Sequence, residues 1–234
     1  MNKRICILLL ALLAFHVGMA AQSFSPVGIV TEDGGQEKND TIFPGSGYSG
    51  TAPIVVKFNA CISEDKEVTS HMSEWRIYTD GNEEQPMRVY YEDSIDYTFD
   101  VTDSYNIKYY VTFTNKATGE KQEFSSDVMR VSLATSSLKV PNAFSPNNDG
   151  IHDKLTVSYQ SIVKFDAYIF NRWGQELYHW GLDEIDQGWD GTYNGSPVKE
   201  GVYFILVDAK GADGVKYNFK KAVNLLRGFT PTTK

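Results

Sequence analysis

The sequence is poor in cysteine, histidine, tryptophan and positive charge. It contains two cysteines, four histidines and four tryptophans in 234 residues. A disulfide-rich scaffold is therefore excluded, and few side chains remain for nucleophilic or metal chemistry. Lysine and arginine number 22 against 30 acidic residues, which gives a net charge of −8. Duplex binding needs a basic footprint, so the composition excludes nucleic acid as a partner.

The first 21 residues, 1–21, have the pattern of a signal peptide. Lys3 and Arg4 precede an apolar run at residues 5–15, and small residues follow at 18–21. The run is shorter than the roughly 20 residues that span a bilayer as a helix, so we predict cleavage and export. Cys6 leaves with this segment, and we expect Cys61 to remain as a buried thiol.

Charge is distributed unevenly along the rest of the chain. Residues 22–137 carry 9 basic and 19 acidic residues, whereas residues 138–234 carry 11 of each. Small polar residues precede Val140 and Pro141, a composition typical of a linker, so we predict a domain boundary at Ser137. Residues 22–50 are rich in Gly, Asp, Glu and Ser, and we expect them to be partly disordered.

Residues 51–137 show the period of two that is typical of β-strands. Apolar residues alternate with more polar ones at 54–59 and again at 107–113. About seven short strands and no helical period predict an acidic immunoglobulin-like β-sandwich. Residues 74–81 resemble part of the polycystic-kidney-disease (PKD) type of surface sandwich.

Four turn motifs, each attached to a predicted strand, occupy residues 138–228. Pro and Gly fix such corners, and Asn and Asp side chains hydrogen-bond the turn backbone. The flanking strands at 165–170, 202–208 and 215–226 predict a second β-sandwich. In chain order the motif residues are Pro141, Asn142, Phe144, Pro146, Asn147, Asp149, Gly150 and Asp153; Asn171, Arg172, Trp173 and Gly174; Trp189, Asp190 and Gly191; and Gly201 and Tyr203.

In this order and spacing, the motifs resemble the gliding-motility-associated C-terminal domain family, the type B sorting domain of the type IX secretion system. The resemblance covers residues 138–228 and implies a β-sandwich that addresses an exported protein to an outer-membrane translocon and a shuttle protein, and so to the cell surface or medium. The motif residues become candidate partner contacts, with Arg172 and Trp173 first, because Arg and Trp dominate many interfaces. The chain departs from the family at His152, where Asn is usual, and in a tail at residues 229–234.

Residues 147–153 also have features of a calcium-binding loop. Asn147, Asp149 and Asp153 offer oxygen ligands around Gly150, which permits a sharp reversal. The segment lacks the distal bidentate Glu of such loops, and an Asx-rich turn held by its own side chains accounts for the same residues. A Ca²⁺ site and a structural turn therefore both remain open, and no other cofactor is expected.

The sequence offers no catalytic motif. It lacks a His-Glu-x-x-His zinc motif, a Gly-x-Ser-x-Gly elbow and a phosphate-binding Gly-Lys-Ser/Thr loop, and only His71, His152 and His179 follow the predicted signal peptide. We therefore predict that the protein is not an enzyme. We expect an all-β protein, with two immunoglobulin-like sandwiches in tandem, that is directed to the cell surface by type IX secretion or stays bound to the secretion or gliding apparatus.

Other hypotheses remain for the whole chain. One is a surface adhesin with an extracellular glycan or protein ligand, for which Trp75, Tyr90 and Tyr91 are candidate contacts, although core packing explains the same aromatics. Another is a periplasmic structural protein. A third is a hydrolase whose carboxylates are brought together only by folding.

Overall fold

The structure is a computed structural model that describes residues 22–228. The described residues form strands, turns and one short 3-10 helix, η1 (Leu182–Glu184), and contain no helix long and apolar enough to cross a membrane. The chain divides into two compact units between Ala134 and Thr135. The predicted all-β class with two sandwiches is confirmed. The predicted signal peptide and tail lie outside the described residues.

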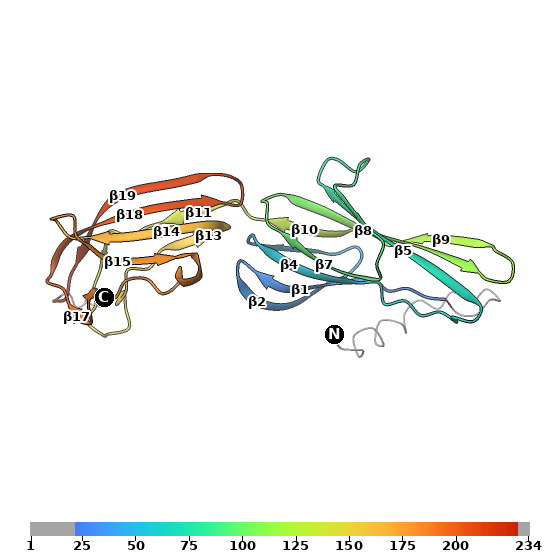
Figure 1. Cartoon of the computed structure of the whole chain (residues 1–234), viewed down its shortest axis with the longest axis horizontal. Helices are drawn as coiled ribbons and strands as arrows, with labels where there is room; N and C mark the ends of the chain where they lie inside the picture. The colour runs from blue at the N-terminus through green and yellow to red at the C-terminus, as the bar shows by residue number, and fades with distance from the viewer. Residues whose placement is uncertain (1–21, 229–234) are drawn as a thin grey trace, which may run out of the picture. The chain divides into compact units, whose positions relative to one another are not determined.

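The first unit consists of two packed sheets (Figure 1). One is antiparallel with the order β2-β1-β4-β7. The other has the order β3-β10-β8-β5-β6, in which β3 runs parallel to β10 and β9 pairs with the distal part of β8. The bounds are β1 Val27–Asp33, β2 Gln36–Ile42, β3 Gly47–Gly50, β4 Ile54–Asn59, β5 Thr69–Thr79, β6 Arg88–Tyr90, β7 Ser94–Phe99, β8 Ser104–Asn115, β9 Lys121–Ser125 and β10 Met129–Leu133.

The core of the first unit lies between these sheets. The sequence predicted alternating apolar residues in β4 and in residues 107–113 of β8. These residues point into the core, and each is at most 2% exposed. Trp75 packs against Phe58 and Tyr109, with ring centroids 5.4 Å and 4.6 Å apart. Because Trp75 is 0% exposed, it is a core residue and the alternative role as a glycan contact is wrong. Tyr90 is half-buried, whereas Tyr91 is 65% exposed.

Three strands occupy residues 27–50, so the expected disorder of this segment is wrong. β1 lies inside its sheet, between β2 and β4, and β3 pairs with β10. Val27, Val30 and Ile42 are at most 1% exposed. The composition of the segment is polar because β2 is an exposed edge strand, and this average conceals the apolar strand beside it. The first sandwich therefore begins at Val27 instead of residue 51.

Cys61 is buried, as predicted, with 7% exposure. The prediction of a thiol concerns the chain without residues 1–21, and it stays a prediction. The other cysteine of the sequence, Cys6, lies outside the described residues.

The second unit is built on one five-stranded sheet with the order β12-β19-β18-β14-β15. Two short antiparallel pairs, β11-β13 and β16-β17, and the connecting loops complete it. Its own core includes Leu155, Trp180, Trp189 and Val223, each at most 2% exposed. The bounds are β11 Ser137–Lys139, β12 Ala143–Phe144, β13 Ser158–Gln160, β14 Ile162–Phe170, β15 Glu176–Gly181, β16 Thr192–Tyr193, β17 Ser196–Pro197, β18 Gly201–Gly211 and β19 Lys216–Leu225.

Both units contain the same tyrosine-stabilised corner. In the first unit the hydroxyl of Tyr105 donates to the carbonyl oxygen of Val101 at 2.7 Å, and in the second Tyr203 donates to that of Lys199 at 2.6 Å. A tyrosine that bonds the backbone a few residues upstream is typical of immunoglobulin-like sandwiches. In the second unit this bond fixes the loop that enters β18.

Candidate functional site

The predicted turn motifs gather at one end of the second unit. β14 ends at Phe170, which pairs with Phe204 near the start of β18, so the turn after β14 and the loop before β18 lie at the same end. Arg227 joins the loops that contain Pro146 and Gly191 to this end through hydrogen bonds. We call residues 145–153, 171–175 and 189–201, together with Arg227, the turn end; it lies at the left of Figure 1.

The carboxylate of Asp153 organises the first loop of the turn end. One oxygen accepts hydrogen bonds from the backbone N–H groups of Asn147 and Asn148 at 3.0 and 2.7 Å, and the other accepts from Gly150 at 2.8 Å. Burial tends to raise the pKa of Asp153, but the bonds from Gly150, Asn148 and Asn147 outweigh it, and the pKa is lowered. The loop therefore folds around a negative charge that its own backbone satisfies.

The other candidate calcium ligands have similar internal partners. The side-chain carbonyl of Asn147 accepts from the Asp149 N–H at 3.1 Å, while the Asp149 carboxylate accepts from Ile151 N–H at 2.8 Å and from the Asn147 amide at 2.9 Å. Within residues 22–228 there is no group of three or more His, Cys, Asp or Glu placed to hold a metal ion. These contacts favour the structural-turn interpretation, and calcium binding stays a prediction to be tested.

Three aromatic or apolar motif residues lie in the core. Trp189 is 0% exposed and packs between Phe144 and Tyr203, with ring centroids 5.4 and 5.2 Å away. Its indole N–H donates to the carbonyl oxygen of Thr192 at 2.8 Å. Burial raises the pKa of Tyr203 despite the nearby arginines, which lower it. Phe144, Trp189 and Tyr203 therefore hold the turns in place and do not offer a surface to a partner.

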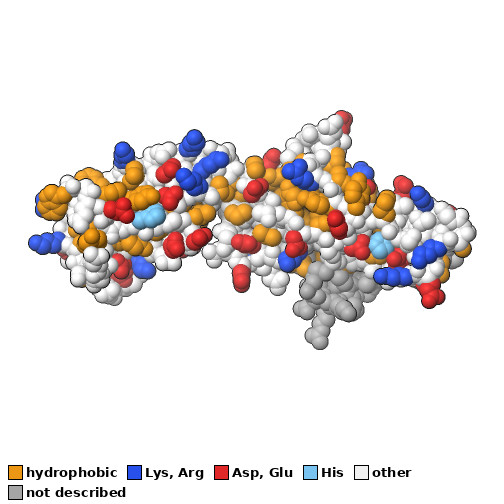
Figure 2. Space-filling view, in the orientation of Figure 1, with side chains coloured by type: hydrophobic (Ala, Val, Ile, Leu, Met, Phe, Trp, Pro, Cys, Tyr) orange, Lys and Arg blue, Asp and Glu red, His pale blue; other side chains and the backbone are white. Residues whose placement is uncertain are grey.

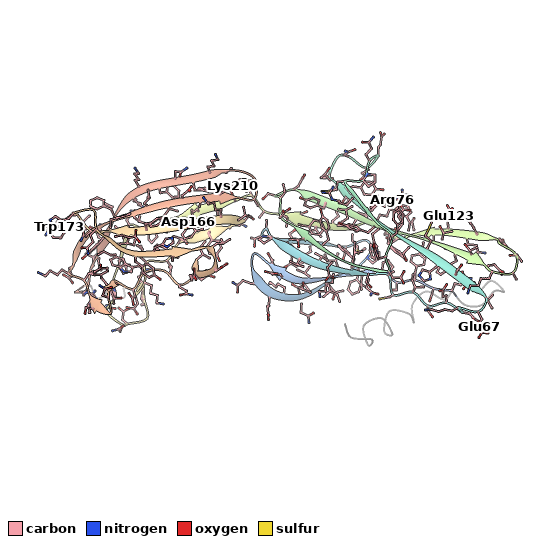
Figure 3. All side chains as sticks on the ribbon, in the orientation of Figure 1. Glu67, Arg76, Glu123, Asp166, Trp173 and Lys210 are labelled. Atoms are coloured by element: carbon pink, nitrogen blue, oxygen red, sulfur yellow. The ribbon has the colours of Figure 1, made fainter. Side chains whose placement is uncertain are left out.

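Arg172 and Trp173 project from the turn between β14 and β15. The side-chain oxygen of Asn171 accepts from the N–H groups of Trp173 and Gln175 at 3.0 Å each, and Gly174 takes the positive φ of 81° that the reversal requires. The guanidinium carbon of Arg172 lies 4.5 Å from the centre of the Trp173 ring, a cation–π contact. Trp173 is 77% exposed, and Figure 3 shows it at the tip of the unit.

Arg227, which sequence reasoning missed, links three loops of the turn end. Its guanidinium donates to the carbonyl oxygens of Gly191 at 2.9 Å, Val198 at 3.1 Å and Pro146 at 3.3 Å. The carboxylate of Glu200 accepts from the backbone N–H of Arg227 at 2.6 Å. The sequence offers one signal: Arg172 and Arg227 are the only arginines after residue 134, in a unit that otherwise uses lysine. An arginine binds several carbonyls at once because its donors form a rigid fork.

The remaining motif residues shape turns and edges. Asp190 accepts from the N–H of Thr192 at 2.9 Å, and Gly201 has a φ of 146°. The carbonyl of Asn142 accepts from the N–H of Asn224 at 2.9 Å, beside the exposed Pro141. Of the 17 predicted contacts, the structure thus brings most to one end, leaves Pro141 and Asn142 beside β19, and exposes Arg172 and Trp173 most clearly.

Residues 138–224 match a family model described as the CHU_C type IX secretion signal domain. The second unit carries a CHU_C domain. This confirms the resemblance read from the four motifs. The CHU_C match extends from β11 nearly to the end of β19, so Arg227 lies just beyond it. The first unit lies outside the matched residues, and its resemblance to PKD domains stays a prediction.

No curated protein matches the chain. Among solved structures, latent dimeric PorU of Porphyromonas gingivalis aligns at 8% identity and a TM-score of 0.21, over 87% of this chain but only 34% of PorU. A tetra-tandem repeat of a large adhesion protein aligns at 12% identity and a TM-score of 0.27, covering 88% of this chain and 68% of that one. A Bacteroides ovatus protein, SGBP-B of a mixed-linkage glucan utilization locus in complex with a mixed-linkage heptasaccharide, aligns at 14% identity and a TM-score of 0.23. The alignment covers 76% of this chain and 42% of that one. At such scores these likenesses support no inference about fold or function.

Proposed function

We propose that this chain is a non-enzymatic protein exported by type IX secretion, with the CHU_C domain as its address. The observation that carries the proposal is the family match of residues 138–224. The domain has a hydrophobic core of its own, which supports folding and recognition as a separate unit. Its destination is the cell surface or the medium, and its partners are the outer-membrane translocon and a shuttle protein.

Recognition would take place at the turn end, with Arg172 and Trp173 as the central contacts. Trp173 is the most exposed large hydrophobic side chain among residues 22–228. Arg172 already stacks on its ring, so the two side chains lose little conformational freedom on binding. The bonds of Asn171 hold the turn in one shape before a partner arrives.

The geometry of the first unit supports the non-enzymatic part of the proposal. Ser73, His71 and Asp93 lie close together, but the Ser73 hydroxyl bonds Asp93 at 2.5 Å and Tyr109 at 2.8 Å instead of a histidine nitrogen. Ser73 is 2% exposed. A nucleophilic serine needs access to substrate, and the burial of Ser73 denies it that access.

A fusion experiment tests the address. Residues 135–234 are joined behind a signal peptide and a fluorescent reporter, and surface exposure is scored by protease shaving in a type-IX-competent host and in a host without the translocon. We expect surface arrival only in the competent host. Periplasmic retention in both hosts would contradict the proposal and favour a periplasmic structural protein.

Matched substitutions locate the recognition surface in the same assay. Trp173→Ala is compared with Leu182→Ala, which removes another exposed apolar side chain of the same unit, 37% exposed. We expect Trp173→Ala to reduce export and Leu182→Ala to leave it unchanged. Copurification of the exported chain with the translocon would identify a retained accessory component instead of released cargo.

A further inference from the structure

An open cavity of about 450 Å³ lies on the first unit, over β3 and β10. Its lining is dominated by glycine and serine residues of 45–49, together with Ser132 and Arg130. The hydroxyls of Ser49 and Ser132 lie on this lining, and Ser132 accepts a bond from Ser104 at 3.2 Å. A lining of hydroxyls and main chain suits a ligand that is itself rich in hydrogen-bonding groups.

Arg130 supplies a positive charge with unused donors at this cavity. Among the described residues its side chain makes one hydrogen bond, from Nε to the side-chain oxygen of Asn106 at 3.4 Å, and no carboxylate of residues 22–228 lies within 4.0 Å of its guanidinium. The terminal guanidinium nitrogens therefore keep the paired donors that bind a carboxylate. Gly47 makes room for this side chain, because an added Cβ would lie 3.3 Å from the Arg130 Cβ.

Two more cations occupy the same face of the sheet. Lys108 lies directly opposite Arg76 in the register of β8 and β5, an arrangement of like charges that destabilises a sheet. Both cations contact the Tyr110 ring, at 5.3 Å and 4.2 Å from its centre. Glu74 pairs with Arg76 at 2.6 Å, but no such partner is found for Lys108 within the described part of the chain. Figure 3 labels Arg76 on this sheet.

The register brings these cations within reach of one ligand. Arg130 pairs with Asn106, and Lys108 is two residues further along β8 on the same face. Such diagonal neighbours are about 7–8 Å apart. The carboxylate of Glu83 lies near Asn106, at 3.5 Å from its amide, so the local excess of positive charge is small. This positive face is nevertheless an exception in residues 22–137, which carry 9 basic and 19 acidic residues.

We propose that this face of the first unit binds a saccharide that carries carboxylates. Arg130 binds one carboxylate, Lys108 attracts a second, and the hydroxyls of Ser49 and Ser132 bond the sugar hydroxyls. The negative charge of the rest of the unit repels densely charged polyanions, so the ligand bears one charge per sugar at most. This function is separate from the export address, and a protein that is not exported by type IX secretion would still show it.

The test uses the full exported chain and isothermal titration with hexagalacturonate, with cellohexaose as the neutral probe. The double variant Arg130→Gln/Lys108→Gln is compared with Lys57→Gln, which removes an exposed lysine from β4 in the other sheet. We expect the double variant to weaken hexagalacturonate binding by at least about tenfold, since charge-assisted hydrogen bonds are lost. We expect Lys57→Gln to bind like the original protein, cellohexaose to bind more weakly, and added salt to weaken binding.

A conservative variant distinguishes a loss of binding from a loss of folding. Arg130→Lys keeps the charge but loses the paired donors, so it should also bind hexagalacturonate more weakly while its melting temperature is unchanged. Absence of binding by the original protein, or equal weakening by Lys57→Gln, would overturn the proposal. Tighter binding of hexaglutamate than of hexagalacturonate would assign the face to an acidic protein partner and would overturn the proposal of a saccharide ligand.

Discussion

The guanidinium of Arg227 donates to the carbonyl oxygen of Gly191, with 2.9 Å between Nη2 and the oxygen. It also donates to the carbonyls of Val198 and Pro146. One side chain that follows the last strand therefore holds three loops of the CHU_C domain together. A guanidinium is suited to this position because it satisfies several carbonyls at once without a carboxylate partner.

Removal of this side chain should loosen the turn end. We expect Arg227→Ala to lower the free energy of unfolding of the second unit by about 2 kcal/mol, because carbonyls lose a charged donor. Arg227→Lys should recover only part of the loss, since one ammonium cannot reach all three carbonyls. Urea denaturation followed by tryptophan fluorescence measures this, because three of the four tryptophans, at 173, 180 and 189, lie in this unit. Equal stability of Arg227→Ala and the original protein would refute the linking role.

The two motif tryptophans should respond in opposite ways. Trp189→Ala removes a side chain with 0% exposure, and we expect a loss of stability of about 3–5 kcal/mol. Trp173 is 77% exposed, so Trp173→Ala should change stability by less than about 0.5 kcal/mol but reduce export. Chemical denaturation and the shaving assay measure the two effects on the same proteins. A strong loss of stability in Trp173→Ala would show that this residue serves the fold.

His71 should make the stability of the first unit depend on pH. Its two ring nitrogens lie 2.8 Å from Glu64 and 2.9 Å from Asp93, and only the doubly protonated ring donates to both carboxylates. Burial lowers the pKa of His71, but the bonds to Glu64 and Asp93 outweigh it, and the pKa is raised. The stabilisation is thus fully present below the unfolded pKa of about 6.5 and is lost as pH rises through the folded pKa.

Asp93 acts in the opposite direction. Burial raises its pKa, but bonds from Ser73 and His71 outweigh this effect and lower it. Its contribution is present above an unfolded pKa of about 3.9 and is lost as pH falls through the folded value. We therefore expect His71→Gln to cost most stability between about pH 4 and 6.5 and less at pH 8. Urea denaturation at several pH values measures the difference. A loss of stability that is independent of pH would exclude ionic contacts of His71 with Glu64 and Asp93 as its cause.

Calcium should have no effect on the loop at residues 147–153 if it is a structural turn. Its carboxylates already accept backbone N–H bonds, so we expect the melting temperature to be the same in millimolar calcium and in EDTA. Asp153→Ala should lower the melting temperature in both, since three N–H groups lose their acceptor. Scanning calorimetry of both proteins, in calcium and in EDTA, measures these melting temperatures. A calcium-dependent rise that Asp153→Ala abolishes would establish a calcium site.

His152 occupies a backbone conformation that most residues avoid. Its φ is 56°, in the left-handed region, where Asn is more readily accommodated than most residues. We expect His152→Asn to keep or slightly raise the stability of the second unit, and His152→Val to lower it by about 1–2 kcal/mol. Chemical denaturation of both variants tests this expectation. Equal stability of the Val and Asn variants would mean that the backbone relaxes here.

Local patterns predicted much of this molecule. The alternation at residues 54–59 corresponds to β4, and the long apolar runs near residues 165 and 202 correspond to β14 and β18. The disorder expected for residues 22–50 was wrong because β2 is polar along an exposed edge, although β1 beside it is buried. Figure 2 shows acidic and basic side chains interspersed on the visible face of the second unit, in keeping with its balanced composition.

The sequence by itself determined the strand class, the tandem sandwiches and the family of the second unit, since period, turn residues and motif spacing are local properties of the chain. Only the tertiary structure decided which motif residues are exposed and which are buried. Trp173 and Trp189 belong to equally clear motifs, yet one is exposed and the other is buried. Arg227 and the charged face around Arg130 arise from strands and loops far apart in the chain. Burial and proximity of this kind depend on which segments become neighbours in the fold, and local sequence patterns do not specify those neighbours.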